Sequence, residues 1–257
     1  MDDRLCKYGE WALVTGASSG IGAEFCRQLA ARKLNLVLVA RRADRLQQLS
    51  ATLTQAHGIE TRVVVADLSR DDFLAPIAAA TDALDVGLLV NNAGFALTGK
   101  FLEHVLDGAL ALQNVNCRAP MMLAHHFGRR MVQRGRGGII NVSSASAFMP
   151  LPYWSQYAAS KIYLLHLSEA LWFELKDQGV DVLALCPGST RTEFARIAGT
   201  QMQGMDPEYV VARALASIGR RPSVVPGLGN VVASWIGRLL TRRRAVILGS
   251  MVVGPRA

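Results

Sequence analysis

Short apolar runs alternate with amphipathic stretches along most of the chain, and this alternation constrains the fold more than any other feature. Most of the apolar runs are continuous, as in the strands of a parallel sheet that helices cover on both faces. The predicted strands are Trp11–Thr15, Asn35–Ala40, Thr61–Ala66, Val86–Asn91, Gly138–Ser144, Val180–Cys186 and Ser223–Pro226. The predicted helices are Gly20–Arg32, Ala43–Ala56, Arg70–Ala83, Glu103–Arg134, Ser155–Asp177, Pro207–Ile218 and Asn230–Thr241. This order predicts an α/β fold with a doubly wound parallel sheet of about seven strands.

Length and composition favour one domain without a membrane span. The chain has 257 residues, of which 51% are hydrophobic, and it contains no linker, repeat or low-complexity stretch. We therefore expect a single domain over residues 1–257. No run of about 18 apolar residues occurs, and the N-terminus lacks the pattern of a signal peptide. Because the cysteines and histidines show no ligand or disulfide spacing, we expect a cytoplasmic protein without a metal site.

The net charge of +8 raises the question of an anionic partner. The arginines are spread along the chain, and no basic stripe with interleaved aromatic residues or nucleic-acid motif occurs. We therefore expect no nucleic-acid partner. The charge is interpreted as an aid to solubility and as an attraction for an anionic cofactor.

A glycine-rich turn links the first predicted strand to the first predicted helix. Its sequence is Thr15-Gly16-Ala17-Ser18-Ser19-Gly20-Ile21-Gly22. Gly16 allows the tight turn, Gly20 lets the backbone approach a phosphate, and Gly22 permits close helix–strand packing. The amides at the helix start then face an anion, and the two serines can add hydroxyl donors. This context predicts a Rossmann-like dinucleotide site.

The end of the second predicted strand favours NADP(H) over NAD(H). An acidic residue about twenty positions after the glycines would bind the 2′-hydroxyl of NAD, but the sequence there is Arg41-Arg42. Arginine can pair with a 2′-phosphate. Asp67, followed by Leu68, ends the third strand and is placed to bind the adenine amino group. Two alternatives stay open: the arginines simply begin a solvated helix, or Asp44 contacts the ribose.

A tyrosine and a lysine on one predicted helix carry the chemistry. Tyr157 and Lys161 are four residues apart, so they share a helix face. A phenol titrates near ~10 and transfers protons poorly at neutral pH unless a nearby cation stabilises the phenolate. Ser144, thirteen residues before the tyrosine at a strand end, can orient a substrate oxygen. Together they predict proton transfer for a carbonyl/alcohol pair. Ser143 is the rival serine, but neighbouring residues of a strand point opposite ways.

In order along residues 9 to 192, these motifs resemble those of the short-chain dehydrogenase/reductase family, in its single-domain form. The family's glycine motif matches Thr15 to Gly22, and its N-N-A-G motif matches Asn91 to Gly94. Its active-site asparagine matches Asn116, its serine and Y-x-x-x-K match Ser144, Tyr157 and Lys161, and its proline–glycine segment matches Pro187 to Thr192. The four catalytic positions show no departure from the family pattern.

The resemblance implies roles for these residues. Tyr157 would be the general acid in reduction and the general base in oxidation, and Lys161 would lower its pKa and hold the nicotinamide ribose. Ser144 would polarise the substrate oxygen, and Asn116 would fix, through its backbone, a water linking Lys161 to solvent. The residues expected to bind the cofactor are Gly16, Ser18, Ser19, Gly20, Ile21, Gly22, Arg41, Arg42, Asp67, Leu68, Asn92, Ala93, Gly94, Tyr157, Lys161, Pro187, Gly188, Thr190 and Thr192.

The segments around the proposed site favour a small lipophilic ketone or alcohol as substrate. Residues 145–154 are apolar and aromatic and would form one wall of the pocket; the alternative is that they pack in the core or a subunit contact. Residues 190–218 would form a lid. The two long helices after residue 103 are, in this family, the usual faces of a homodimer or homotetramer, and their apolar content predicts a homo-oligomer.

The C-terminal extension, about residues 228–257, combines an amphipathic helix with Arg242-Arg243-Arg244. Packing on its own domain or on a partner subunit is the preferred interpretation, and contact with a membrane surface is the alternative.

The favoured function is an NADP(H)-dependent carbonyl reductase or alcohol dehydrogenase. Two other functions are compared with it: a 3-oxoacyl-thioester reductase, for which Arg129, Arg130, Arg134 and Arg136 are candidates to bind a carrier, and a non-catalytic NADPH-sensing protein.

Overall fold

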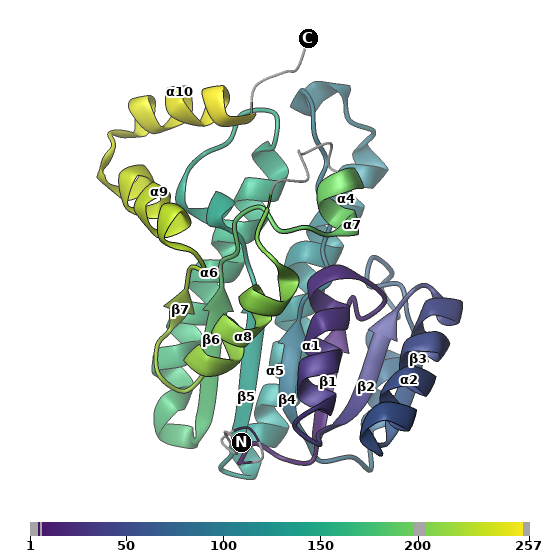
Figure 1. Ribbon diagram of the computed structural model, residues 1–257. Helices are drawn as coiled ribbons and strands as arrows, with labels where there is room; N and C mark the ends of the chain where they lie inside the picture. Colours follow the sequence, from purple (N-terminus) through teal and green to yellow (C-terminus); the bar gives the residue numbers. More distant parts are fainter. Residues whose placement is uncertain (1–4, 6, 198–203, 254–257) are drawn as a thin grey trace.

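A parallel sheet forms the centre of the molecule (Figure 1). The computed structural model describes residue 5 and residues 7–197 and 204–253. The strands found among these residues are β1 (Trp11–Thr15), β2 (Asn35–Ala40), β3 (Thr61–Val65), β4 (Val86–Asn91), β5 (Gly137–Val142), β6 (Val180–Leu185) and β7 (Ser223–Val224). They lie in the order β3-β2-β1-β4-β5-β6-β7, and each neighbouring pair is parallel. The predicted doubly wound sheet is confirmed.

Helices cover both faces of this sheet. Their bounds are α1 (Gly20–Ala30), α2 (Ala43–His57), α3 (Leu74–Thr81), α4 (Leu106–Gln113), α5 (Ala119–Gln133), α6 (Ser155–Leu175), α7 (Glu193–Ile197), α8 (Pro207–Ser217), α9 (Leu228–Leu239) and α10 (Arg242–Val253). Shorter helical turns are η2 (Phe101–Glu103), η3 (Asn114–Arg118), η4 (Ala145–Phe148) and η5 (Lys176–Gln178). Helices α1, α2 and α8 share a core with one face of the sheet, and α3, α5 and α6 share one with the other.

The two cores follow from the twofold periodicity of the strands. Val14 of β1 and Leu38 of β2 contribute to the core under α1, whereas Leu13 and Val37 contribute to the core under α5. Successive side chains of a strand point to opposite faces, so each strand must be apolar at every position when both faces are covered. This is why the strands were recognisable as continuous apolar runs.

The structure differs from the expected elements at several points. The helix expected over 103–134 begins at Leu106, and its middle is a π-helical turn, η3, a deviation that is frequent at functional sites. The strand expected to reach Ser144 ends at Val142. Helix α10 was not expected at all.

The order of the strands places a crevice where neighbouring crossovers run in opposite directions. The chain winds from β1 outward to β3, then crosses back to β4, which lies beside β1. Ligands of such sheets bind at this switch point, at the carboxyl ends of the strands. The glycine turn after β1, Asn92 after β4 and Ser144 after β5 all lie at that edge. In the part of the chain that the structure describes, no helix is long and apolar enough to cross a membrane.

Candidate active site

The loop between β1 and α1 is shaped by glycines. Gly16 and Gly20 have φ angles of +66° and +55°, a region that residues with a Cβ rarely adopt. A Cβ at Gly22 would lie 2.3 Å from the Gly16 carbonyl oxygen, so the first turn of α1 packs directly on the loop. The N-cap residue, Ser19, makes no side-chain cap, and the first turn carries no acidic residue. The amides at the positive end of α1 therefore fit the pyrophosphate of a dinucleotide.

Thr15 and Asn92 bind the glycine loop to the end of β4. The Thr15 hydroxyl oxygen accepts hydrogen bonds from the amides of Asn92 and Ala93, both at 3.0 Å. The Asn92 side-chain amide donates to the Thr15 carbonyl at 2.9 Å. The Asn92 side chain thus supports the loop, and its expected contact with the dinucleotide stays a prediction. From the sequence, Thr15 was expected only as a member of the glycine motif. Its hydrogen bonds to Asn92 and Ala93 form because β1 pairs with β4 in the sheet.

Arg42 reaches over the glycine loop. Its guanidinium donates to the hydroxyls of Ser18, at 3.0 and 3.2 Å, and Ser19, at 2.9 Å. It also binds both carboxylate oxygens of Glu193, at 2.9 and 3.1 Å, and Arg45 binds the same carboxylate at 3.0 Å. Hydrogen bonding from Arg42 holds the pKa of Glu193 below its usual range. Arg42 therefore does more than begin α2, and Glu193 is a contact that sequence reasoning missed.

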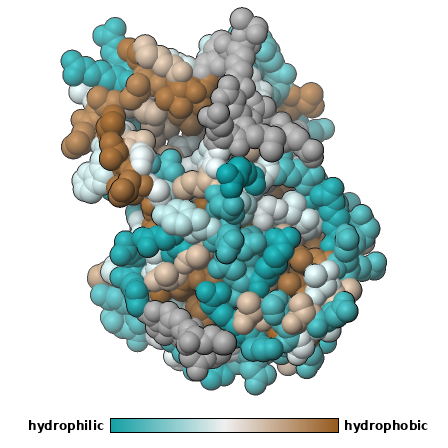
Figure 2. All heavy atoms as spheres, in the orientation of Figure 1, coloured by the Kyte–Doolittle hydropathy of each residue, from teal (hydrophilic) through white to brown (hydrophobic). Residues whose placement is uncertain are grey.

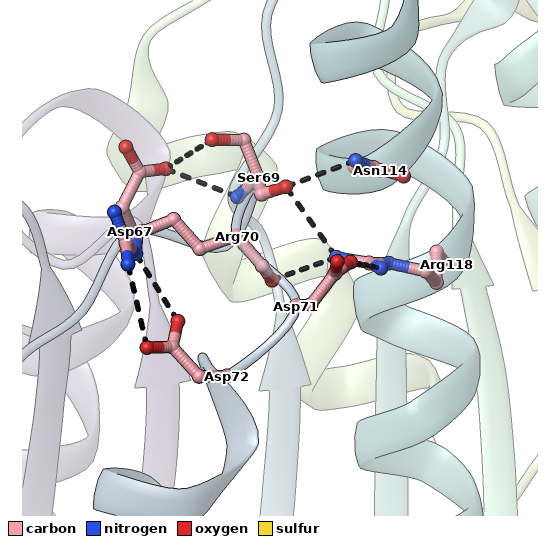
Figure 3. Close-up of polar contacts among 7 residues, drawn as sticks. All are labelled: Asp67, Ser69, Arg70, Asp71, Asp72, Asn114 and Arg118. Carbon is pink, nitrogen blue, oxygen red and sulfur yellow. Dashed lines mark hydrogen bonds and ion pairs between the residues drawn. The ribbon is translucent and has the colours of Figure 1, made fainter.

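The loop after β3 holds Asp67 (Figure 3). Because this residue is expected to bind adenine, we call this part of the crevice the adenine side. Its carboxylate accepts hydrogen bonds from the Ser69 amide and hydroxyl, at 3.0 and 2.8 Å. Partial burial raises the pKa of Asp67, but these bonds and the charges of Arg41 and Arg70 together hold it below its usual range. Arg41 is exposed and acts on Asp67 through its charge. Asp67 therefore stays an ionised acceptor at neutral pH.

The same loop is fastened to the π-helical turn η3. The Asn114 side chain donates to the Ser69 carbonyl at 2.9 Å, and Arg118 donates to the Arg70 carbonyl at 2.6 Å and pairs with Asp71. Asn116, in the middle of the turn, instead contacts the catalytic region. One short element thus connects the adenine side to the catalytic side.

Tyr157 and Lys161 share the buried face of α6. The Lys161 Nζ lies 5.5 Å from the centre of the Tyr157 ring and donates to the Val142 carbonyl at 2.9 Å. Burial lowers the pKa of Lys161 to about 8. Burial raises the pKa of Tyr157 to about 12, against a smaller lowering by hydrogen bonding with Ser144. Desolvation is therefore the larger of these two effects on the phenol. The expected lowering of its pKa by Lys161 stays a prediction.

Ser144 and Ser143 have different partners. The Ser143 hydroxyl is buried and donates to the Lys161 carbonyl at 2.6 Å, so it joins β5 to α6. Ser144 is half-buried, and its hydroxyl oxygen accepts from the Ser146 amide at 3.1 Å as the cap of η4. Hydrogen bonding with Ser144 also acts on the Tyr157 phenol. This arrangement favours Ser144 as the residue that meets a substrate oxygen.

The Asn116 side chain is fully engaged in positioning. Its amide donates to the Phe95 carbonyl and to the Ser160 hydroxyl, both at 3.0 Å, and its oxygen accepts from the Phe95 amide at 3.1 Å. Ser160 in turn donates to the Tyr157 carbonyl at 2.7 Å. A Cβ at Gly94 would lie 3.1 Å from the Asn116 oxygen and 3.3 Å from the Lys161 Nζ. Gly94, in the segment after β4, therefore packs against both η3, which carries Asn116, and α6, which carries Lys161.

The segment after β6 closes the crevice from the side of α1. Its Pro187 carbonyl accepts from the Ala145 amide at 2.8 Å, next to Ser144. Thr190 donates to the Gly188 carbonyl at 3.0 Å. Thr192 packs on the glycine loop, since a Cβ at Gly20 would lie 3.1 Å from its side chain. These contacts place the segment between the glycine loop and the catalytic residues.

Aromatic side chains surround the catalytic phenol. The ring of Trp154 contacts Tyr157 edge-on at a centroid distance of 5.5 Å, and the ring of Phe194 lies 5.7 Å away. Phe194 belongs to α7, so the expected lid reaches the phenol. Residues 198–203 of that lid lie outside the described part of the chain. Residues 145–154 as a wall of the substrate pocket stay a prediction.

The cysteines near the site are not reactive thiols. Burial raises the pKa of Cys117, and it raises that of Cys186 to about 12. A thiolate is the nucleophilic form of cysteine, so neither side chain competes with Tyr157. Within the described ranges, no group of three His, Cys, Asp or Glu side chains could hold a metal ion.

Comparison with known proteins agrees with this geometry. The model of the family described as short chain dehydrogenase matches residues 10–203. The chain is 34% identical over 232 residues to a 7beta-hydroxysteroid dehydrogenase of Collinsella aerofaciens, covering 87% of this chain and 88% of the relative. It is 30% identical over 239 residues to a very-long-chain 3-oxoacyl-CoA reductase of Anas platyrhynchos, covering 90% and 76%.

The fold is also similar to solved structures. A short-chain dehydrogenase from Sphingobium yanoikuyae in complex with NADPH superposes with a TM-score of 0.82 and 34% identity, covering 97% of this chain and 98% of the other. The similarity extends beyond the sheet to nearly the whole chain.

Replacing the buried ammonium should stabilise the protein. We expect Lys161→Met to raise the free energy of unfolding near neutral pH by about 3 kcal/mol, because about 1.4 kcal/mol accompanies each unit of pKa shift and burial lowers the pKa of Lys161 from 10.5 to about 8. Between these two values the unfolded chain binds the proton that the folded chain has lost, so wild-type stability rises with pH. The gain of the variant should therefore disappear near pH 10.5.

Urea unfolding at several pH values measures this difference. Lys100→Met is the control, because the side chain of Lys100 is 70% exposed and its loss should leave the pH profile of wild type unchanged. A Lys161→Met variant that is less stable than wild type near neutral pH, or a gap that is independent of pH, would contradict the burial cost of this ammonium.

Proposed function

We propose the function of this chain on one premise: it belongs to the short-chain dehydrogenase family. It is an oxidoreductase that interconverts a ketone and a secondary alcohol with a nicotinamide cofactor. Within that class, we propose that it prefers NADP(H) to NAD(H) and acts on a small lipophilic substrate. The observation that carries the proposal is the convergence of Ser144, Tyr157 and Lys161 beside the glycine loop that Arg42 spans.

Tyr157 is the proposed proton donor and acceptor. A bound nicotinamide supplies the hydride in reduction and accepts it in oxidation, and Lys161, Thr192 and the glycine loop are the residues proposed to hold it. Because the pKa of Tyr157 is about 12, the phenol is protonated at neutral pH and can give its proton to the substrate oxygen during reduction. In oxidation the deprotonated oxygen takes the alcohol proton.

Ser144 and Lys161 support this proton transfer. The Ser144 hydroxyl is proposed to hydrogen-bond the same substrate oxygen as Tyr157, which fixes the carbonyl and polarises it. Lys161, whose pKa is about 8, can release and regain a proton near physiological pH. Asn116 is proposed to act as a positioning residue, because its side chain holds Phe95 and Ser160. Its proposed backbone contact with a water stays a prediction.

Substitutions of two adjacent serines test the site. We expect Ser144→Ala to lower kcat for ketone reduction on the order of 10²-fold, the effect of losing one oriented donor to a reacting oxygen. Tyr157→Phe should lower it at least as far, because it removes the proton. The matched control is Ser143→Ala, which loses a structural hydrogen bond and should cost about 1 kcal/mol of stability while keeping kcat within a few-fold.

Steady-state kinetics with a soluble lipophilic ketone, together with urea unfolding, measures both effects. Full turnover by Tyr157→Phe would remove this residue from its role. A larger loss of kcat in Ser143→Ala than in Ser144→Ala would exchange the roles of the two serines.

The preference for NADP(H) rests on Arg42. Its guanidinium lies over Ser18 and Ser19 of the glycine loop, where the ribose next to a bound pyrophosphate would come. Glu193 neutralises part of its charge, so a 2′-phosphate would have to share or replace that carboxylate. The NADPH complex of the Sphingobium relative supports the choice of cofactor.

Removing the two strand-end arginines tests this preference. We expect Arg41→Ala combined with Arg42→Ala to weaken NADPH binding roughly 10- to 100-fold, since a charge-assisted hydrogen bond contributes about 1.5–3 kcal/mol. NADH binding should change less than about threefold, because it lacks the phosphate. Calorimetric titration with both cofactors measures the ratio, and Arg27→Ala, an exposed arginine of α1, is the control. Equal losses for both cofactors would contradict phosphate recognition by these arginines.

A lipophilic substrate is proposed from the aromatic wall. Trp154 and Phe194 flank the phenol, and the relatives are named for a hydroxysteroid and for very-long-chain 3-oxoacyl-CoA. The second name favours the 3-oxoacyl-thioester reductase as an alternative function. Arg134 and Arg136, however, pair with Asp85 at the start of β4, at the sheet edge opposite the site. This placement does not favour a carrier contact through Arg134 and Arg136.

A homo-oligomer is proposed from the outer faces of α5 and α6. Met121, Tyr163 and Phe173 expose apolar surface there, and a shallow hollow runs along α5 between Leu74 and Gln133. Such surface on paired helices is typical of subunit contacts.

A non-catalytic NADPH-sensing role is not favoured, because it requires neither the buried Lys161 nor Ser144 beside the phenol.

A further inference from the structure

The net charge of this protein is confined to its C-terminal part. All 20 acidic residues occur at or before Glu208, together with 20 of the 28 basic residues. Residues 1–208 are therefore neutral, and residues 209–257 carry the whole net charge of +8. Arg238, Arg242, Arg243 and Arg244 of this part lie on α9 and α10 and are exposed. Such a distribution fits an anionic partner at one end of the molecule.

The same two helices expose apolar side chains. Figure 2 shows them as a brown area over α9 and α10, at the upper left of the view. Along α9 the exposed apolar residues are Leu228, Val232, Trp235, Ile236 and Leu239. Their spacing places them in one stripe that faces away from the sheet. Leu228 and Leu239 are 86% and 80% exposed, and on α10 Met251 is 76% exposed. Within the described residues, this stripe is left uncovered, while the other side of α9 contacts the domain at Gly237.

Both helices are held beside the substrate wall. A Cβ at Gly237 of α9 would lie 2.7 Å from the Phe148 carbonyl, and one at Gly249 of α10 would lie 2.1 Å from the Pro150 carbonyl. The Arg238 guanidinium lies 4.7 Å from the centre of the Phe148 ring. The chain from Phe148 continues to Trp154, which contacts Tyr157. Helices α9 and α10 therefore lie against the segment that carries Trp154.

We propose that the outer surface of α9 and α10, which we call the α9–α10 surface, docks on an anionic lipid bilayer. A helix with an apolar face and flanking arginines lies in the interfacial plane of a membrane, with tryptophan at headgroup level. Each arginine near an anionic leaflet contributes about 1 kcal/mol, which corresponds to about a fivefold change in affinity. Neither helix needs to cross the bilayer, and lipid binding of this kind does not depend on the reaction catalysed.

Charge favours lipid over a second copy of the chain as the occupant. A twofold contact would place the α9–α10 surface of one protomer on that of its partner. Two arginine clusters would then meet, and no acidic residue follows Glu208 in either segment. Like charges brought together in this way oppose association. Anionic headgroups instead neutralise the arginines while the apolar stripe enters the interface.

Vesicle flotation of the full chain tests the proposal. The probes are vesicles of phosphatidylcholine alone and of phosphatidylcholine mixed with phosphatidylglycerol. We expect binding to the mixed vesicles that weakens with added salt, and much weaker binding to phosphatidylcholine alone. The triple variant R242Q/R243Q/R244Q should lose about a hundredfold in affinity. The control R213Q/R220Q/R221Q removes the same charge from α8 and from the turn that follows it, and should stay within about threefold of wild type.

A second pair of measurements separates the possible occupants. Val232→Ser with Leu239→Ser should weaken vesicle binding while ketone turnover and thermal unfolding stay as in wild type. Absence of binding to mixed vesicles, or equal losses in the two arginine variants, would overturn the proposal. So would sedimentation velocity that shows a dimer which the serine variant dissociates, because the occupant would then be a second copy.

Discussion

The burial of one ammonium group is the constraint on which the site depends. Lys161 has 4% of its surface exposed, and the hydrogen bond that the described structure gives its side chain goes to the Val142 carbonyl. Removing a charge from water costs free energy that a single neutral partner does not return. The surrounding fold must therefore hold this group by packing: Gly94 lies against it, and Ser143 binds its backbone carbonyl. Lys161 is the residue proposed to hold the nicotinamide ribose, whose hydroxyls would give this ammonium further hydrogen-bond partners.

The parts of the crevice are joined by a few side chains rather than by one continuous surface. Thr15 connects β1 to β4, and Asn116 connects the turn η3 to α6 through Ser160. The same turn carries Asn114 and Arg118, which hold the loop after β3. A π-helical turn places side chains at angles that a regular helix does not offer. This irregularity lets one element position both the adenine side and the catalytic side.

The features that could be predicted from the sequence are those defined by a short local pattern. The strands were readable because most of them are nearly continuous apolar runs, and the glycine turn and the Tyr157–Lys161 pair because their spacing alone defines their geometry. Sequence reasoning missed the contact between Arg42 and Glu193, which joins residues 151 positions apart, and the π-helical turn, whose reason lies in partners on another loop. It also did not anticipate that burial raises the pKa of Tyr157, because burial is a property of the packed protein and not of the spacing.

The central claim is that burial holds the proton on Tyr157 until substrate and cofactor are in place. Its most direct test is an NMR titration of protein labelled with carbon-13 at the tyrosine ring, with Tyr157→Phe used to assign the signal. In the cofactor-free protein, a Tyr157 resonance that stays protonated through pH 10 and titrates near the value of about 12 is the result predicted here. A Tyr157 that titrates well below the ordinary tyrosine value of ~10 would show that Lys161 dominates over burial, and would contradict the account.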